Sequence, residues 1–133
     1  MTEQVYLWNV PTYDVARIRE VVRATIDGLG LRPRGRILVK PNTVIAHAEL
    51  FRHAFTRPEF LDGVLAAIGD RADDGPDPIG VGERCGITIP TRYAFHEAGY
   101  LPVLDRRRAR AVYFDEEPQV EVPGTGQFLA PRE

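Results

Sequence analysis

The pattern of hydrophobic and polar positions along the chain predicts three amphipathic helices. Apolar residues recur at three- and four-residue spacing from Val15 to Leu29, the period of a helix with one buried face. A second apolar stripe extends from Phe60 to Ile68, after the helix-start sequence Thr56-Arg57-Pro58-Glu59. A third helix is expected from Thr91 to Ala98, where Gly99 supplies the stop.

Short runs of β-branched and aromatic residues between these helices predict strands. The clearest runs are residues 4–10, 36–39, 79–82 and 109–114, and weaker alternation occurs at residues 120–122 and 128–129. The apolar run at 36–39 is expected to be a buried parallel strand. Strands that alternate with helices imply right-handed crossovers. The predicted fold class is therefore α/β, with a mostly parallel sheet of about four to six strands and flanking helices, in a three-layer or an open two-layer arrangement.

Length and composition favour one globular domain over residues 1–133. The chain is 44% hydrophobic and 27% charged, values typical of folded domains. The net charge of −2 offers no basic excess to neutralise phosphates, so nucleic acid is not the expected partner, and only the segment Arg106–Arg110 favours it. No apolar run approaches the ~20 residues of a membrane span. Residues 1–4 contain no basic region followed by an apolar stretch, so we expect no signal peptide.

The single cysteine, Cys85, limits the covalent and metal chemistry of the chain. It excludes an internal disulfide, a cysteine-only zinc site and an iron–sulfur cluster ligated within this chain. A reducing cytoplasm agrees with this composition, and we expect a cytoplasmic protein without a membrane partner. Cys85 itself could be a nucleophile next to Arg84, although a lone cysteine is more often a small buried apolar residue.

Two segments lie where predicted strands end, which is where open α/β sheets bind ligands. Lys40-Pro41-Asn42 follows the first of them, and Lys40 would place a compact cation there while Asn42 orients a carboxylate, phosphate or carbonyl group. Glu83-Arg84 follows the second, where Arg84 could clamp an anion and Glu83 could act as a general base or metal ligand. The alternatives are a lysine that extends into solvent and a surface ion pair of about 0–1 kcal/mol.

Other charged residues carry weaker signals. Arg57, with Arg52, flanks the helix start at Pro58 and could bind an anion, or could be ordinary solvated charge. The histidines His47, His53 and His96 do not have the spacing of a helical metal pair. The acidic run Asp115-Glu116-Glu117 is expected to be a solvated turn rather than a cation site. The glycines Gly80, Gly82 and Gly86 miss the dinucleotide-binding spacing by one residue.

Four motifs, taken in order, resemble those of one family. Gly35-Arg36-Ile37-Leu38-Val39-Lys40-Pro41-Asn42 resembles the G-x-x-V-L-[IV]-K-P-N signature of the domain of unknown function 362 family. Thr56–Glu59 resembles its T-x-P-E helix start, and Ile79–Glu83 resembles its V-x-V-G-[DE] strand. Phe114–Glu117 resembles its [DL]-x-[DE] segment. The resemblance covers roughly residues 3–130 and implies no activity.

The sequence departs from that family in two respects. Some members carry ferredoxin-like cysteine motifs, which are absent here, so the cofactor stays unknown and no iron–sulfur cluster is expected within this chain. Members usually continue into a second half with a P-K-x-K-T-H-like segment, whereas this sequence stops at Glu133. We therefore expect residues 1–133 to be a fragment, or a compact or split form, of the longer family domain.

Two functions from different classes follow from these observations. The first is an enzyme, or half of one, that acts on a small anionic metabolite at the strand-exit crevice. Its catalytic candidates are Lys40 and Glu83, no metal is expected, and its ligand-binding residues are Lys40, Asn42, Arg57, Glu83 and Arg84. The second is a non-catalytic accessory or binding subunit, which forms a homo-oligomer or pairs with a partner that supplies the missing half.

Overall fold

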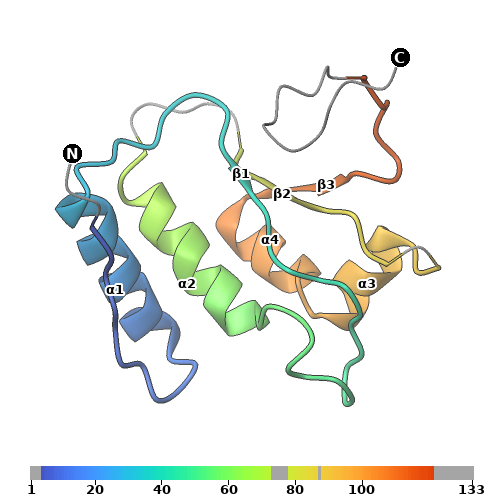
Figure 1. Cartoon of the computed structure of the whole chain (residues 1–133), viewed down its shortest axis with the longest axis horizontal. Coiled ribbons are helices and arrows are strands. Elements are labelled where there is room, and N and C mark those ends of the chain that lie inside the picture. The colour runs from blue at the N-terminus through green and yellow to red at the C-terminus, as the bar shows by residue number, and fades with distance from the viewer. Residues whose placement is uncertain (1–3, 73–77, 87, 122–133) are drawn as a thin grey trace, which may run out of the picture.

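Helices and strands alternate along the chain, as the hydrophobic pattern predicts. In a computed structural model, described for residues 4–72, 78–86 and 88–121, four helices accompany one three-stranded parallel sheet (Figure 1). The described elements are, in chain order, α1 (Val15–Gly28), β1 (Leu38–Val39), α2 (Pro58–Gly69), β2 (Gly80–Glu83), α3 (Thr91–Glu97), α4 (Leu101–Arg107) and β3 (Arg110–Tyr113). The predicted α/β class is therefore confirmed.

The central strand of the sheet is β2, because the strand order is β1-β2-β3. All four residues of β2 are buried, whereas β1 lies at an edge and its Leu38 is 54% exposed. The expectation that residues 36–39 form a buried strand is therefore wrong, since an apolar run of this length does not distinguish a central from an edge position. The described sheet also has three strands, fewer than the four to six expected.

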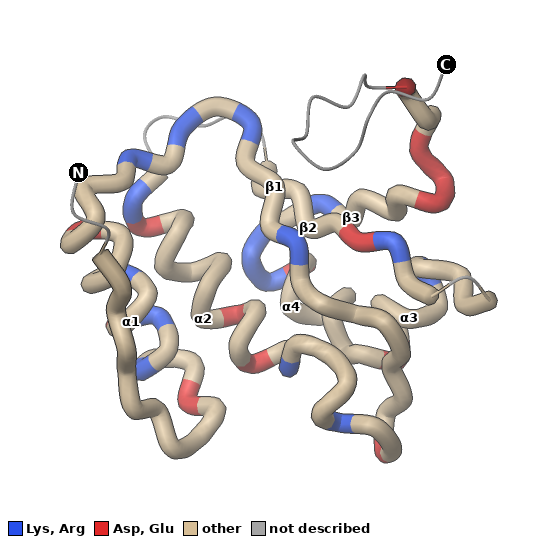
Figure 2. Tube along the Cα trace, viewed as in Figure 1, with Lys and Arg blue, Asp and Glu red and all other residues tan. Residues whose placement is uncertain are grey.

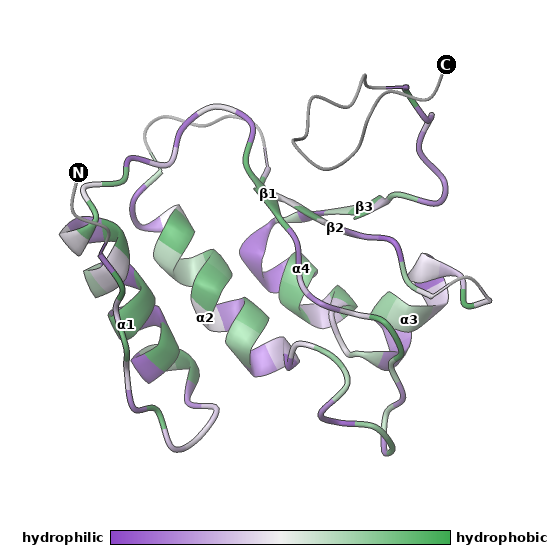
Figure 3. Cartoon of the chain, in the orientation of Figure 1, coloured by the Kyte–Doolittle hydropathy of each residue, from purple (hydrophilic) through white to green (hydrophobic). Residues whose placement is uncertain are grey.

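The two faces of the sheet differ in what covers them. Val39, Val81, Ala111 and Tyr113 belong to the core that the sheet shares with α2, α3 and α4. Hydrophobic residues occur along the strands and within each of these helices (Figure 3). On the other face, side chains of Leu38, Val112 and Phe114 lie over Gly80 and Gly82. No helix covers that face in the part of the chain that the structure describes, which favours the open two-layer arrangement.

Residues 4–10 are not the predicted strand. They are extended and run beside α1, but no backbone hydrogen bond joins them to another strand among the described residues. The Trp8 indole N–H donates to the Thr25 hydroxyl of α1 at 2.8 Å instead. Aromatic and β-branched residues suit any half-buried extended segment, and here the apolar side of α1 takes the place of a neighbouring strand.

The C-terminal strand predictions have different outcomes. Residues 118–121 form no strand, and Val120 is 81% exposed. Residue 122 and residues 128–129 lie outside the described residues.

Helix α4 was not predicted, and it changes the role of the arginine-rich segment. Pro102 lies in the first turn of this seven-residue helix, where proline is tolerated. Arg106 and Arg107 end the helix and bind the Asp62 carboxylate of α2, at 3.1 and 2.5 Å. Asp62 is 6% exposed, so its charge needs these partners. Two arginines of this segment therefore join α4 to α2.

No described helix is long and apolar enough to cross a membrane.

We expect Asp62→Ala to lower the free energy of unfolding by about 1.5–3 kcal/mol, because it removes charge-assisted hydrogen bonds between α2 and α4. Chemical denaturation followed by circular dichroism measures the change. Asp105→Ala is the matched control, because Asp105 is an exposed carboxylate of α4 with no ion pair in the described structure. We expect the control to change stability by less than about 0.5 kcal/mol. Equal losses in both variants would contradict the assigned role of Asp62.

Candidate functional site

Lys40 and Glu83 meet where two neighbouring parallel strands end. The Lys40 Nζ lies 2.7 Å from Glu83 Oε2, and the other carboxylate oxygen accepts the Arg84 backbone N–H at 2.8 Å. The Glu83 side chain is 8% exposed and that of Lys40 is 59% exposed. Oppositely charged segments accordingly lie together at this end of β1 and β2 (Figure 2). A buried carboxylate thus holds a lysine whose ammonium group remains open to solvent.

The loop after Lys40 closes on itself before α2 begins. The Asn42 N–H donates to the Thr56 hydroxyl at 3.0 Å, and the Thr56 N–H donates to the Asn42 carbonyl at 2.8 Å. The Asn42 side-chain amide donates to the Ala54 carbonyl at 3.4 Å. Asn42 therefore holds the two ends of the long loop together, which is a structural role that its position in the motif did not reveal.

Tyr100 fastens this loop to the core. Its hydroxyl donates to the Thr56 carbonyl at 2.7 Å and lies 3.1 Å from the Thr43 hydroxyl. Burial raises the pKa of Tyr100 to about 12, so the phenol keeps its proton and remains a donor at neutral pH. Sequence reasoning missed Tyr100, because Tyr100 lies 44 residues from Thr56 along the chain and no motif joins them.

A shallow pocket opens at the end of β2. Its volume is about 240 Å³, and its lining residues are Arg84, Cys85, Gly86, Thr88, Ile89, Pro90 and Asp115. Arg84 is exposed, and its guanidinium makes no ion pair in the described part of the chain. Asp115 accepts the Thr91 N–H at 3.1 Å; burial works to raise the pKa of Asp115, but the bonds from Thr91 and the charge of Arg84 lower it overall.

Cys85 is a poor candidate for a nucleophile. The residue is 6% exposed, and its backbone N–H donates to the Thr91 hydroxyl at 3.1 Å. Burial raises the pKa of the Cys85 thiol, and the negative charges of Glu83 and Asp115 act in the same direction. The neutral thiol is therefore favoured, which agrees with a small residue packed in the core.

Arg57 is engaged by its local neighbours. Its guanidinium bonds to the Glu59 carboxylate at 3.1 Å and lies 5.1 Å from the centre of the Tyr13 ring. Arg52 is exposed.

The remaining candidates have local partners. The His47 Nδ1 accepts the backbone N–H groups of Glu49 and Leu50, so His47 organises its loop. His53 is exposed, and His96 lies 3.1 Å from the neighbouring Glu97. Glu116 binds Arg92 at 2.7 Å. The described residues contain no group of three or more histidine, cysteine or acidic side chains that could hold a metal ion.

One signal in the sequence singles out Lys40. It is the only lysine among the seventeen basic residues of the chain. Lysine differs from arginine because its ammonium is compact and can lose its proton when the surroundings favour it.

Of the five predicted ligand-binding residues, the structure joins Lys40, Glu83 and the backbone of Arg84 directly. The side chains of Asn42 and Arg57 bond to other residues instead.

We expect the Cys85 thiol to react at least about tenfold more slowly in the folded protein than in the unfolded chain, because burial disfavours the reactive thiolate. The reaction with a chromogenic disulfide reagent at pH 8, with and without denaturant, measures both rates. Because Cys85 is the only cysteine, the signal has one source. A folded-state rate as fast as that of the unfolded chain would instead support a nucleophile.

Comparison with known proteins identifies the family. No curated protein and no solved structure matches the chain. The family described as domain of unknown function (DUF362) matches residues 37–131, which include the Lys40 and Glu83 strand ends. The chain therefore belongs to the DUF362 family.

Proposed function

We propose that the chain binds a small anionic metabolite at the carboxyl ends of β1 and β2 and works there as an enzyme or as half of one. The observation that carries this proposal is the Lys40–Glu83 pair beside the pocket that Arg84 lines. Open α/β sheets bind ligands outside the carboxyl ends of their strands, which is the location of these side chains.

The charges of the site suit an anion. The Lys40 ammonium has three donors, of which Glu83 takes one, and its side chain is 59% exposed. The exposed guanidinium of Arg84 offers a second cation with a planar pair of donors. Lys40 and Arg84 would contact the ligand, while Asn42 keeps the loop closed around the site.

Glu83 has two roles in this proposal. Its buried carboxylate holds Lys40 at the strand end, and it is the group that could accept a proton from a bound substrate. Arg57 is the weakest member of the proposed set, because Glu59 and Tyr13 already engage its guanidinium.

Thermal unfolding in the presence of inorganic phosphate and a panel of phosphorylated and carboxylated metabolites tests the site. A compound that binds the folded state stabilises it by about 2.7 kcal/mol at a concentration one hundred times its Kd. We expect this stabilisation to disappear in Lys40→Ala and to fall in Arg84→Ala, each compared with its own ligand-free protein. Arg17→Ala removes one positive charge from the exposed side of α1 and should keep full stabilisation.

Lys40→Ala leaves the Glu83 carboxylate buried with one hydrogen bond, so the variant could lose its fold. The double variant Lys40→Ala, Glu83→Gln removes that charge and keeps the test valid. If the same compound stabilises the folded double variant as strongly as the original chain, the site assignment is wrong.

The open face of the sheet favours a second candidate function, a non-catalytic accessory subunit that pairs with another chain or with its own copy. Parallel sheets usually have both faces covered, whereas Leu38, Val112 and Phe114 lie on a face without a described helix. Leu38 is 54% exposed on that face. A partner that covers these residues would also lie next to the strand ends.

Light scattering after size exclusion, with affinity purification from the native source, tests this second candidate. We expect the chain to associate, and we expect Leu38→Glu to weaken the association by placing a charge on the open face. Leu50→Glu is the matched control, because Leu50 is also 54% exposed but lies in the loop. A monomer that purifies without a partner would contradict the accessory role.

A further inference from the structure

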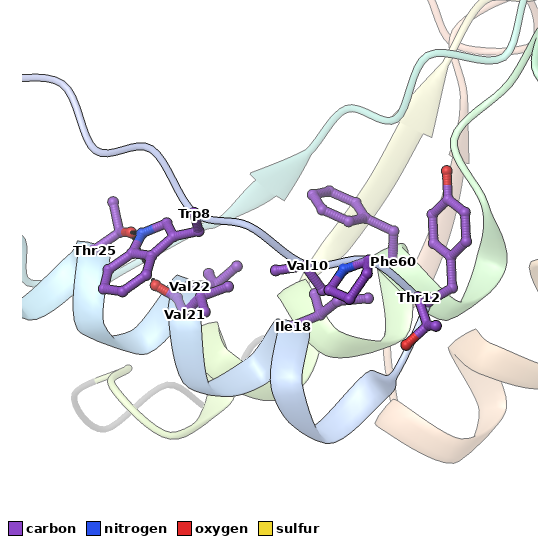
Figure 4. A pocket seen from close by; sticks show the side chains of 10 residues that line it. Trp8, Val10, Thr12, Ile18, Val21, Val22, Thr25 and Phe60 are labelled. Carbon is purple, nitrogen blue, oxygen red and sulfur yellow. Dashed lines mark hydrogen bonds between the residues drawn. The ribbon is translucent and has the colours of Figure 1, made fainter.

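We propose a second binding site, for a small uncharged aromatic or apolar molecule, between the N-terminal extended segment and helices α1 and α2. The hollow has a volume of about 470 Å³, within the usual range of small-molecule pockets. Residues 8 and 10–13 form one wall, α1 forms the floor and Phe60 of α2 adds an aromatic ring to the lining (Figure 4). It shares no lining residue with the pocket at the end of β2.

The walls of this hollow present mainly apolar surface, and the polar side-chain atoms of Trp8 and Thr25 bond to partners within the fold. The Trp8 indole N–H donates to the Thr25 hydroxyl at 2.8 Å, and that hydroxyl donates to the Val21 carbonyl at 2.9 Å. The side chains of Val10, Val22 and Phe60 complete the walls (Figure 4). A ligand therefore meets mainly rings and methyl groups.

Three large aromatic side chains around the hollow remain uncovered. Trp8 is 45% exposed, Tyr13 is 54% exposed and Phe60 is 43% exposed. Single exposed apolar residues are common on protein surfaces, but several around one hollow mark a binding surface. A flat apolar ligand would remove this aromatic surface from water and would gain about 25 cal/mol for each Å² buried.

The uncharged lining of the hollow favours an uncharged ligand. None of its described lining residues carries a charged side chain. Arg57 contacts one lining residue, Tyr13, but its guanidinium is already bound to Glu59. An anionic or cationic ligand would lose water at this site without gaining a charged partner, which is unfavourable.

Trp8 makes the site directly observable, because it is the only tryptophan of the chain. The neutral dye N-phenyl-1-naphthylamine accepts energy from excited tryptophan when the two lie close together. We expect saturable dye fluorescence on excitation of Trp8, with a matching decrease in tryptophan emission. Unsaturable binding, or binding without energy transfer from Trp8, overturns the proposal.

Two matched variants locate the dye. Phe60→Asp places a carboxylate at the hollow, and an acidic residue is favourable in the first turn of α2, so the fold should persist. Tyr93→Asp makes the same exchange at the third residue of α3, where the ring is 54% exposed. We expect dye affinity to fall at least about tenfold in Phe60→Asp and to stay unchanged in Tyr93→Asp.

Circular dichroism confirms that both variants are folded before the dye is added. Equal affinities in Phe60→Asp and the original chain, or equal losses in both variants, would show that the dye does not bind this hollow.

Discussion

The structure depends on a central strand that is buried along its whole length and ends in a carboxylate. Glu83 closes β2 at a position where its side chain is 8% exposed, so its charge requires a partner. Lys40 supplies that partner from the neighbouring strand, because parallel strands end at the same edge of the sheet. The buried Glu83 carboxylate therefore requires both the pairing of β1 with β2 and the presence of Lys40, the only lysine, at the end of β1.

The loop that leaves this edge is held by groups that lie far apart in the sequence. Tyr100 bonds to the Thr56 carbonyl and lies beside the Thr43 hydroxyl, so the region between α3 and α4 anchors both ends of the loop. The same part of the chain contributes α4, whose arginines bind the buried Asp62 of α2. Buried polar groups thus connect the loop, the helices α3 and α4 and the edge of the sheet. None of the side-chain polar atoms buried in the described structure lacks a hydrogen-bond partner.

The aromatic N-terminal segment and the strand-exit site have opposite chemical characters. The strand ends carry Lys40, Glu83 and Arg84, which suit a charged ligand. The hollow beside α1 presents the surfaces of Trp8 and Phe60, and none of the lining residues that the structure describes is charged. Arg57 shows how the tertiary structure assigns a residue to one region rather than the other, because its guanidinium lies on Tyr13 and binds Glu59.

The sequence by itself determined the features that depend on local periodicity and on motif order. Helix α1, helix α2 and the start of α3 follow from apolar spacing and from glycine and proline positions, and the DUF362 motifs indicated the strand exits. It also placed Lys40 and Glu83 at the ends of strands. These are short-range properties, in which neighbouring residues carry the whole signal.

Only the tertiary structure decided which strand is central, which face is covered and which charges pair. The apolar run at 36–39 predicts a strand but does not show that β1 is an edge, and the strand-like residues 4–10 pack on α1 instead of joining the sheet. The pairs Lys40–Glu83 and Arg107–Asp62 join residues separated by 43 and 45 positions. Such contacts depend on how the elements pack, because burial makes an ion pair necessary only after the surrounding core exists.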